Sequence, residues 1–426
     1  METKSKYKMT EVGEIPIDWE VNKLKSIGKF SSGTGFPEKY QGGKDSKDIP
    51  FFKVSDMNLK GNEVNMIVSN NYVNSQAIAK IKAKVIDKKS IIFAKVGAAI
   101  FLERKRKVSS PFLIDNNMMA FSSDKSIDFN YLYYLFSRIR LSKYAQVGAL
   151  PSYNASDIGN IKVAYPESSL EQQKIAEILS IVDEQIEQTD QLIEKTKELK
   201  KGLMQQLLTK GIEHSEFKQS ELGEIPGEWN IHIYGSITQR ITVGIATSTS
   251  KHYVKNGIPM IRNQNIKNNK IIFNDLLYIS SEFDEKNKSK RLKENDIITV
   301  RTGYPGQSAV VPKELENAQS FTTLISTPNK DIINSEYLSY YINSPIGMEQ
   351  LKNMSAGGAQ QNLNAASLRK LKVVVPSLRE QQQIAEILSS VDEDIEGYEE
   401  EKVKYEELKK GLMQQLLTGK TRVKVD

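Results

Sequence analysis

The sequence lacks cysteine altogether and contains only three histidines. Without cysteine the chain can form neither disulfides nor thiolate metal sites, which is typical of a protein from a reducing compartment. His214, His232 and His252 lie too far apart in the sequence to form a pair of ligands at metal-binding spacing. Each is best interpreted as a surface or loop histidine, so we expect no metal site.

Long apolar runs are also missing. The first ten residues, METKSKYKMT, have no hydrophobic core of the kind that a signal peptide needs. The most apolar stretch, Ile91–Leu102, is interrupted by Lys95 and is too short to cross a bilayer. We therefore expect a soluble, cytoplasmic protein. Its 426 residues are enough for two or three domains, each with its own core.

Motifs that bind nucleotides or activate nucleophiles are absent as well. Gly419–Thr421 is only the end of a phosphate-binding loop, and Gly33-x-Gly35 is followed by Glu38 where a dinucleotide loop would have glycine. The chain contains no HExxH, no Gly-x-Ser-x-Gly and no Pro-Pro pair, the last of which is part of the catalytic loop of adenine methyltransferases. We expect no catalytic residue and no cofactor bound by this chain itself.

What the sequence does contain is a duplication. The twelve residues ELKKGLMQQLLT occur at Glu198–Thr209 and again at Glu407–Thr418, and IAEILS recurs at Ile175–Ser180 and Ile384–Ser389 with the same offset of 209 residues. Upstream, GEIPIDW is echoed by GEIPGEW at an offset of 210, so the only two tryptophans, Trp19 and Trp229, are repeat mates. A period of this length indicates two domain-sized halves rather than a solenoid.

Charge is distributed unevenly between the constant and the variable parts of the repeat. Glu167–Gly211 has a net charge of −3 and Ser377–Lys420 a net charge of −5, which leaves +14 on the rest of a chain whose total is +6. A basic surface attracts phosphate backbones through counterion release. The alternative is a basic surface that serves only solubility.

The constant segments are predicted to be long helices. Pro166 and Pro376 precede them, and Ser168, Ser169 or Ser377 would serve as N-caps. Apolar residues spaced alternately by four and three indicate a coiled-coil seam, interrupted by polar residues at Thr189, Thr196 and Lys402. The seam is formed by Ile175, Leu179, Val182, Ile186, Ile193, Leu199, Leu203 and Leu207, and in the second copy by Ile384, Leu388, Val391, Ile395, Tyr398, Tyr405, Leu408, Leu412 and Leu416.

Each helix needs a partner, and its repeat mate is the closest by pattern. A pseudo-two-fold relation between the halves would make the two helices antiparallel, whereas a translation would set the domains side by side. The two-fold arrangement buries both seams. Gly202 and Gly411 lie inside the most constant block, where either the helix bends or breaks, or a partner backbone approaches closely.

The variable regions are predicted to be two α+β domains of one topology. Expected strands are Ile49–Val54, Ser90–Phe93 and Ile161–Ala164 in the first region, and Ile258–Ile261, Ile271–Phe273, Asp296–Val300 and Leu371–Val375 in the second. Apolar helices are expected at Tyr131–Phe136 and at Tyr337–Ile342.

Polar and basic side chains near the ends of these strands are candidate DNA contacts. Lys95 and Arg301 are repeat mates in glycine-containing loops, and Arg262-Asn263-Gln264 offers the side chains that pair with guanine and adenine edges. Ser152-Tyr153-Asn154 and Gln360-Gln361-Asn362 are interpreted as matching polar loops. The full set of candidates is Lys53, Lys95, Arg104, Lys105, Arg106, Tyr153, Asn154, Arg262, Asn263, Gln264, Arg301, Tyr304, Gln360 and Gln361. For any one of them, a solvated loop is the alternative.

The two GEIPxxW blocks, each followed by a basic region and then by EQQ-x-IAEILS and ELKKGLMQQLLT, resemble the specificity subunit of type I restriction–modification enzymes over nearly the whole chain. The resemblance implies two target-recognition domains, at residues 1–165 and 212–375, and two spacer helices, at residues 166–211 and 376–420, with a short tail at 421–426. It implies a bipartite DNA target, with one half read by each domain and the gap set by the spacers.

The same resemblance implies the partners. Two methyltransferase subunits would hold S-adenosylmethionine and methylate adenine at N6, and two motor and nuclease subunits would use ATP and Mg²⁺. Candidate docking residues on the helices are Gln172, Gln173, Gly202, Gln205, Gln381, Gln382, Gly411 and Gln414. Two other interpretations stay open: a non-catalytic coiled-coil adaptor that presents two basic domains to a protein, and a self-contained nuclease or methyltransferase with an unrecognised site.

Overall fold

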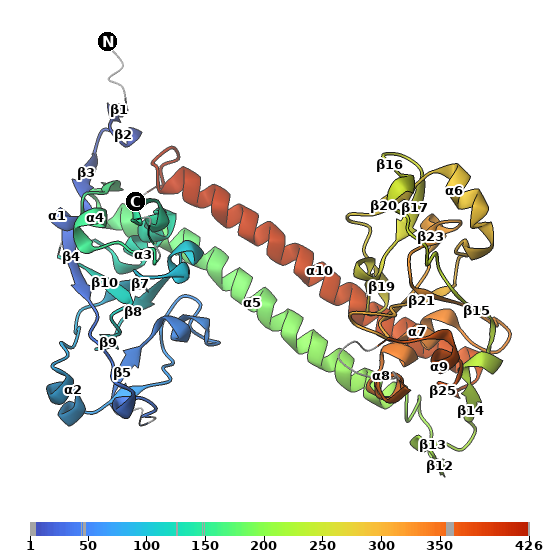
Figure 1. Cartoon of the computed structure of the whole chain (residues 1–426). Coiled ribbons are helices and arrows are strands. Elements are labelled where there is room, and N and C mark those ends of the chain that lie inside the picture. Colours follow the sequence, from blue (N-terminus) through green and yellow to red (C-terminus); the bar gives the residue numbers. More distant parts are fainter. Residues whose placement is uncertain are drawn as a thin grey trace. The chain divides into compact units, whose positions relative to one another are not determined.

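The computed structural model describes residues 6–43, 45, 48–124, 127–146, 148, 150–354 and 362–424. The chain divides into two compact units, which we call the first unit (Met1–Thr189 with Glu401–Asp426) and the second unit (Asp190–Glu400). Each unit therefore combines one α+β region with segments of both long helices (Figure 1).

The first unit is built on an antiparallel sheet in the order β4 (Gly28–Ser32), β10 (Met118–Ser123), β7 (Ser90–Ala94) and β8 (Lys105–Val108). Helix α3 (Phe129–Arg138) packs against β7 and β8 (Figure 1). Residues Tyr131–Phe136 of α3 are all buried, and Phe93 of β7, Phe121 of β10 and Phe136 of α3 share one core. A smaller sheet has the order β6 (Tyr72–Val73), β5 (Ile49–Phe52) and β9 (Leu113–Ile114), in which β5 and β9 are parallel.

The second unit repeats this plan. Its main sheet has the order β15 (Thr238–Val243), β24 (Leu324–Pro328), β21 (Ile297–Thr299) and β22 (Ser308–Val310), and α7 (Ser335–Asn343) lies against β22. Its second sheet has the order β16 (Tyr253–Val254), β20 (Leu277–Ile279), β17 (Ile258–Ile261) and β23 (Gln319–Ser320), again with one parallel pair, β17 with β23. The prediction of two α+β regions with one topology is confirmed.

In each region, the strand that directly precedes the long helix pairs with a strand near the start of the region. Strand β3 (Trp19–Lys23) pairs with β11 (Lys162–Pro166), and β14 (Asn230–Ile233) pairs with β25 (Lys372–Val375). The repeat mates Trp19 and Trp229 begin or precede these strands and are both buried. Hairpins that the sequence did not predict, β1 (Tyr7–Thr10) with β2 (Gly13–Pro16) and β12 (Phe217–Ser220) with β13 (Gly223–Pro226), lie just upstream.

The remaining elements are short. They are α1 (Leu24–Ile27), α2 (Ser75–Ile81), α4 (Ala155–Gly159), α6 (Ser281–Lys286), α8 (Pro345–Met354), α9 (Ala365–Arg369), β18 (Ile266–Lys267) and β19 (Lys270–Ile271). Strand β19 is shorter than predicted, because Phe273 is exposed beyond its end.

The long helices are α5 (Ser169–Leu207) and α10 (Leu378–Leu416). Two of the predicted N-caps are confirmed, since Ser168 Oγ accepts from the Glu171 N–H and Ser377 Oγ from the Glu380 N–H, each at 3.3 Å. Both helices run unbroken through Gly202 and Gly411, and nothing described lies within 4 Å of a Cβ built at either glycine. Of the two predicted explanations, a break in the helix is therefore wrong.

Within each unit the helical segments run antiparallel. In the first unit, Asp183 of α5 binds Lys409 of α10 at 2.5 Å, and Glu171 binds Arg422 beyond the end of α10 at 2.7 Å, so the residue number falls along one helix as it rises along the other. In the second unit, the pairs Lys197–Glu399 and Lys200–Asp392 show the same direction. The predicted antiparallel packing is confirmed, but Leu199 and Leu408 are 55% and 48% exposed and do not belong to the buried seam.

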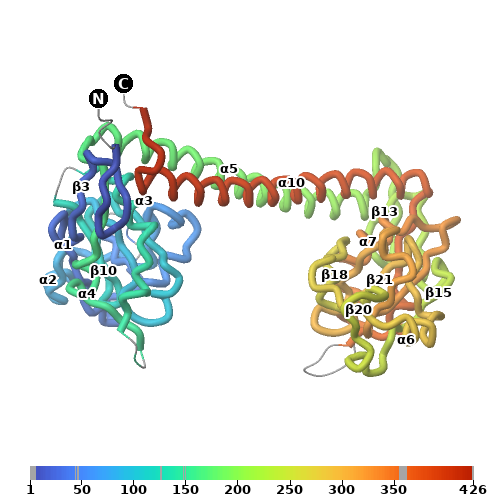
Figure 2. Tube along the Cα trace, turned by 90° about the horizontal axis from the view of Figure 1, so that it is seen from above, coloured from blue at the N-terminus to red at the C-terminus, as the bar shows by residue number. Residues whose placement is uncertain are grey.

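The segment after α10 packs beside the N-terminal hairpin of the first unit (Figure 2). Arg422 donates to Asp18 at 2.8 Å as well as to Glu171, and the backbone of Gly419 lies against Pro16 and Trp19. No helix in the described part of the chain is both long and apolar enough to cross a membrane.

Candidate nucleic-acid interface

Two predicted recognition loops meet in the second unit. Arg262 follows β17 and caps the 3₁₀ turn Asn263–Asn265, while Arg301 follows β21. The Asn263 amide donates to Thr302 Oγ1 at 3.1 Å, which ties the first loop to the second. Beside this contact, Tyr304 is 72% exposed and Gln264 is also exposed. Arg262 and Arg301 are half-buried, and their guanidinium groups donate to the carbonyls of Asp275 at 2.8 Å and Leu363 at 3.3 Å. The two loops thus combine guanidinium, amide and phenol groups, the kinds of group that read base edges and phosphates.

The first unit builds the same frame with different side chains. Lys53 and Arg262 occupy equivalent positions, because each backbone N–H donates to the side chain three residues later. The Lys53 N–H donates to Asp56, and the Arg262 N–H donates to Asn265. Lys95 likewise matches Arg301: their carbonyls accept from the Tyr153 N–H at 3.2 Å and the Leu363 N–H at 3.0 Å.

Basic groups also converge around these positions in the first unit. The Arg104 guanidinium donates to the Asn58 side chain, which joins the loop after β5 to the turn before β8. The Lys53 ammonium donates to Gln41 at 3.1 Å. The Lys95 side chain is half-buried.

The alignment of the last predicted loop needs a correction. Tyr153 and Asn154 correspond to Leu363 and Asn364, because these pairs precede α4 and α9 and make the same backbone contacts. Asn154 and Asn364 are N-caps, whose side-chain oxygens accept from backbone N–H groups of the following helix. Gln360 and Gln361 lie outside the described residues.

The basic run at residues 103–107 is less available to DNA than its composition suggests. Lys105 is only 4% exposed, and its ammonium donates to Glu103 at 2.5 Å and to the Ile139 carbonyl at 2.7 Å. Burial lowers the pKa of Lys105, and the Glu103 carboxylate partly offsets this. Arg106 is half-buried and donates to the Lys105 carbonyl at 3.0 Å. Because the Lys105 ammonium lies against the end of α3, Lys105 is withdrawn as a DNA contact. Arg104, which precedes β8 and is half-buried, is retained.

Tyr153 is withdrawn for a similar reason. Its side chain is 4% exposed, and its hydroxyl donates to the Ala94 carbonyl at 2.5 Å. Burial raises the pKa of the Tyr153 phenol. This tyrosine positions the end of β7, and thereby Lys95, rather than reaching a ligand.

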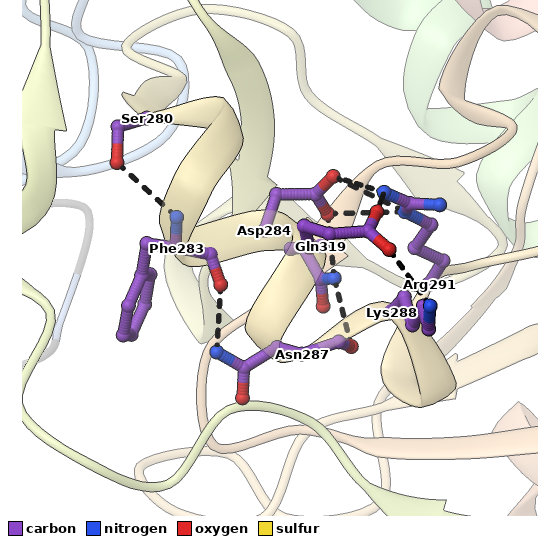
Figure 3. Close-up of polar contacts among 8 residues, drawn as sticks. Ser280, Phe283, Asp284, Asn287, Lys288, Arg291 and Gln319 are labelled. Atoms are coloured by element: carbon purple, nitrogen blue, oxygen red, sulfur yellow. Dashed lines mark hydrogen bonds and ion pairs between the residues drawn. The ribbon is translucent and has the colours of Figure 1, made fainter.

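Arg291 shows that a basic side chain of the second unit can serve the fold instead. Its guanidinium donates to both oxygens of Asp284 and to Glu285, and Gln319 donates to Asp284 at 2.8 Å (Figure 3). Burial alone would raise the pKa of Asp284, but the hydrogen bonds from Arg291 and Gln319 lower it. This network fixes α6, and we do not count Arg291 among the DNA contacts.

The described residues contain no group of three or more histidines, aspartates or glutamates that could hold a metal ion. The family model described as the type I restriction modification DNA specificity domain matches residues 16–198 and again residues 235–405. The chain belongs to this family. The identification made from the repeated motifs is confirmed, and the chain is assigned to DNA recognition in a type I restriction–modification system.

Relatives of this specificity chain extend over its full length. It is 29% identical over 98% of its length to a putative type I restriction enzyme MjaX specificity subunit from Methanocaldococcus jannaschii, 97% of which is covered. It is also 30% identical to the MjaVIII specificity subunit of the same organism, over 76% of this chain and 76% of that relative.

The fold of the specificity chain also has solved counterparts. It aligns with the crystal structure of a type I restriction–modification S subunit from M. genitalium with a TM-score of 0.57 at 14% identity, covering 99% of both chains. A second structure, from a study of complex assembly and conformational transition of the type I system, aligns with a TM-score of 0.56 at 14% identity, covering 96% of this chain and 99% of that chain.

Two of the candidate docking residues of this specificity chain are buried and are withdrawn. Gln172 donates to the Pro166 carbonyl at 2.9 Å and accepts from the Asp128 N–H at 2.7 Å. Its repeat mate Gln381 donates to the Pro376 carbonyl at 2.8 Å and accepts from the Asn334 N–H at 2.7 Å. Both glutamines thus tie the start of a spacer helix to its own recognition region. The other candidates are exposed: Gln173, Gly202, Gln205, Gln382, Gly411 and Gln414.

Sequence reasoning missed a polar cluster that holds the spacer of the specificity chain in each unit. In the first, Asp183 accepts from Tyr134 at 2.7 Å and binds Lys409 at 2.5 Å. In the second, Asp392 accepts from Tyr340 at 2.8 Å and from Lys200 at 2.5 Å. We call these the spacer clusters. The aspartates and lysines are repeat mates at an offset of 209 residues, and the tyrosines recur at an offset of 206, which was the available signal.

Proposed function

We propose that this chain reads a bipartite, asymmetric DNA sequence, one half with each unit, and docks methyltransferase subunits through its repeated helices. One observation carries the proposal: the two units hold matched loops on the same frame but fill them with different side chains. Lys53 occupies the position in the first unit that Arg262 occupies in the second, and Lys95 occupies the position equivalent to Arg301. One frame with two sets of reading groups fits two half-sites of different sequence.

Binding would divide between positioning and reading. Exposed lysines and arginines of the basic regions would neutralise phosphates and fix the register, which carries no sequence information. Arg262, Asn263, Gln264, Arg301 and Tyr304 would contact base edges in one half-site, and Lys53, Lys95 and Arg104 would do so in the other. A bidentate pair of this kind contributes about 1–3 kcal/mol of discrimination against the wrong base.

The chemistry would lie on the partner subunits. An adenine must leave the duplex to be methylated on its exocyclic nitrogen, so the methyltransferases would flip one adenine in each half-site and supply S-adenosylmethionine. Motor and nuclease subunits would supply the ATP- and Mg²⁺-dependent steps. The net acidic spacer helices, with Gln173 and Gln382 exposed at equivalent positions, suit protein partners rather than DNA.

The test measures DNA binding by the chain assembled with its methyltransferase subunits, on a duplex that carries the methylated motif. Arg301→Ala should weaken binding about 10- to 100-fold and relax the preference at bases of one half-site only. Lys330→Ala, at an exposed lysine 29 residues beyond Arg301, is the matched control and should change affinity little. Equal loss for both variants, or DNA binding that requires no sequence, would favour the adaptor interpretation.

A further inference from the structure

A basic groove of about 1240 Å³ lies in the first unit, between the N-terminal hairpin, the end of α3 and the last turns of α10. Seven of its lining residues carry positive charge and two carry negative charge, Glu14 and Glu406. We call it the α10 groove. None of the candidate DNA contacts lines it, whereas Gln414, one of the candidate docking residues, does.

The cations of the α10 groove fall into two groups. Lys162 and Lys409 bind the carboxylates of Glu11 and Asp183, and Arg138 donates to the Leu417 carbonyl at 3.0 Å. Four others, Arg140, Lys143, Lys410 and Lys420, are exposed and have no ion pair within the described ranges. The groove therefore has positive charge that the chain itself does not neutralise.

This charge is a property of the first unit and not of the duplication. Counting from the matched tyrosines Tyr134 and Tyr340, the second unit has Ser344, Ile346 and Glu349 where the first has Arg138, Arg140 and Lys143. Lys420 corresponds to Gly211. Only Lys162, Lys409 and Lys410 have basic mates, so a ligand selected by these charges would bind one unit and not both.

The α10 groove has an apolar floor, because the lining residues Leu135 and Val163 are buried whereas the second group of cations is exposed. Leu135, Ile139, Val163 and Met413 line it between the charges. Tyr144, also in the lining, is 42% exposed.

The apolar surface extends beyond the groove. Tyr144 ends the 3₁₀ turn Leu141–Tyr144, which contacts the turn Ala98–Leu102, where Phe101 and Leu102 are 60% and 57% exposed. An apolar floor with a basic rim matches an amphipathic segment with acidic side chains. A phosphodiester backbone would leave this apolar surface uncovered.

We propose that the α10 groove is a docking site for an acidic, amphipathic segment of a protein partner, bound once per chain. The inference goes beyond the proposed function, in which the repeated helices take two like subunits at equivalent positions. It assigns the chain an asymmetric site that marks the first unit, so that an assembly with two like methyltransferases can still carry a single further partner segment.

The experiment uses the full chain and a fluorescent peptide of about 18 residues, designed as an amphipathic helix with glutamates on one face and leucines on the other. A benzophenone on the peptide reports its position by cross-linking and mass spectrometry. We expect one peptide per chain, cross-linked at residues of the groove such as Tyr144 or Met413. The double substitution Arg140→Glu with Lys143→Glu should weaken binding by at least about ten-fold, because it reverses two free charges.

Three controls decide the outcome. Lys313→Glu with Lys330→Glu makes the same charge change on exposed lysines of the second unit and should leave binding unchanged. A peptide with glutamine in place of glutamate should bind at least about ten-fold more weakly, and a short random DNA duplex should not displace the acidic peptide from the groove. Thermal unfolding of each variant shows that the fold is retained.

The proposal is overturned by two peptides per chain, by equal binding of the glutamine peptide, by an unaffected groove variant, or by displacement with DNA. Sequence-specific DNA binding by the assembled complex is measured in parallel. Its absence with the wild-type chain would contradict the proposed function without bearing on the groove, so the two failures are distinguishable.

Discussion

At the scale of single residues, the buried glutamines at the start of the spacer helices explain why the EQQ motif occurs twice. Gln172 and Gln381 each bridge a proline carbonyl before the helix and a backbone N–H of the recognition region. A buried side chain of this kind cannot be lost without leaving its partners unsatisfied.

Gln172→Ala should therefore lower the free energy of unfolding by about 1–3 kcal/mol, since the Asp128 N–H and the Pro166 carbonyl lose their partner. Its exposed neighbour provides the control, because Gln173→Ala should change stability by no more than about 0.5 kcal/mol. Urea unfolding of both variants measures the difference, and equal effects would contradict a structural role for Gln172.

The tyrosines of the spacer clusters make stability depend on alkaline pH. Burial and then the carboxylate of Asp183 raise the pKa of Tyr134, and burial and Asp392 do the same for Tyr340. The unfolded chain ionises its tyrosines near pH 10, whereas the folded chain keeps these two protonated. Their contribution is thus complete below about pH 10 and is lost as the pH rises toward the folded pKa.

Denaturant unfolding between about pH 8 and pH 11 should show this decline. In the double variant Tyr134→Phe with Tyr340→Phe the decline should be smaller, because other buried tyrosines such as Tyr131 still contribute. An identical pH dependence in the variant would show that these phenols do not provide the linkage.

At the scale of elements, the spacer clusters fix how the helices pair in each unit. Lys409 and Asp183 are 26% and 16% exposed at the side chain, so their ion pair is partly shielded from water. Lys409→Ala leaves the Asp183 carboxylate with only Tyr134, and we expect a loss of about 1–2 kcal/mol in the free energy of unfolding. The adjacent lysine in the same repeat is the control.

Lys410→Ala should have almost no effect, because Lys410 is exposed and holds no ion pair in the described structure. Thermal or urea unfolding separates the two variants. If Lys410→Ala were as damaging as Lys409→Ala, the cluster would not be the cause.

Much of the element structure could be predicted from the sequence. The long helices were predicted as spacers at residues 166–211 and 376–420, two to four residues beyond the observed helix at each end, because two copies of a periodic, capped segment report the same pattern twice. The main core strands β5, β7, β17 and β21 were also predicted, since they are short apolar runs rich in β-branched or aromatic residues. The hairpins β1–β2 and β12–β13 were not, because Tyr7–Thr10 and Phe217–Ser220 are largely polar.

The candidate site was predicted only in part, and burial is the reason. Residue type alone does not distinguish Arg104, which is half-buried, from Lys105, which is 4% exposed and donates to the Ile139 carbonyl at the end of α3. The same holds for Tyr153, which donates to the Ala94 carbonyl, and for Gln172, which accepts from the Asp128 N–H, because both partners are distant in sequence. The contact between Asn263 and Thr302 depends on how two loops fold together, which no local pattern reports.

At the scale of the whole molecule, the two spacer clusters are equally spaced along both helices. Lys200 lies seventeen positions after Asp183, and Lys409 lies seventeen positions after Asp392. A change in the length of one helix alone would therefore put one cluster out of register. This refines how the spacer should be altered to test whether it sets the gap between half-sites.

Inserting four helical residues after Glu194 and four after Glu400 should retain both clusters and lengthen the spacer by about 6 Å. We expect the non-specific gap of the DNA target to grow by one or two base pairs, because base pairs are stacked about 3.4 Å apart. The single insertion after Glu194 should instead lower stability. Binding to a series of duplexes with different gaps measures the change, and an unchanged gap in the double insertion would argue against a ruler.

The most direct test of the central claim, that two independent domains read two half-sites, is the methylated motif in cells carrying the complete system. Residues 20–165 are replaced with the corresponding region of another family member, and the methylated adenines are mapped by sequencing genomic DNA. The account predicts that one half-site of the motif changes while the other half and the gap stay the same. A motif that changes in both halves, or in neither, would contradict it.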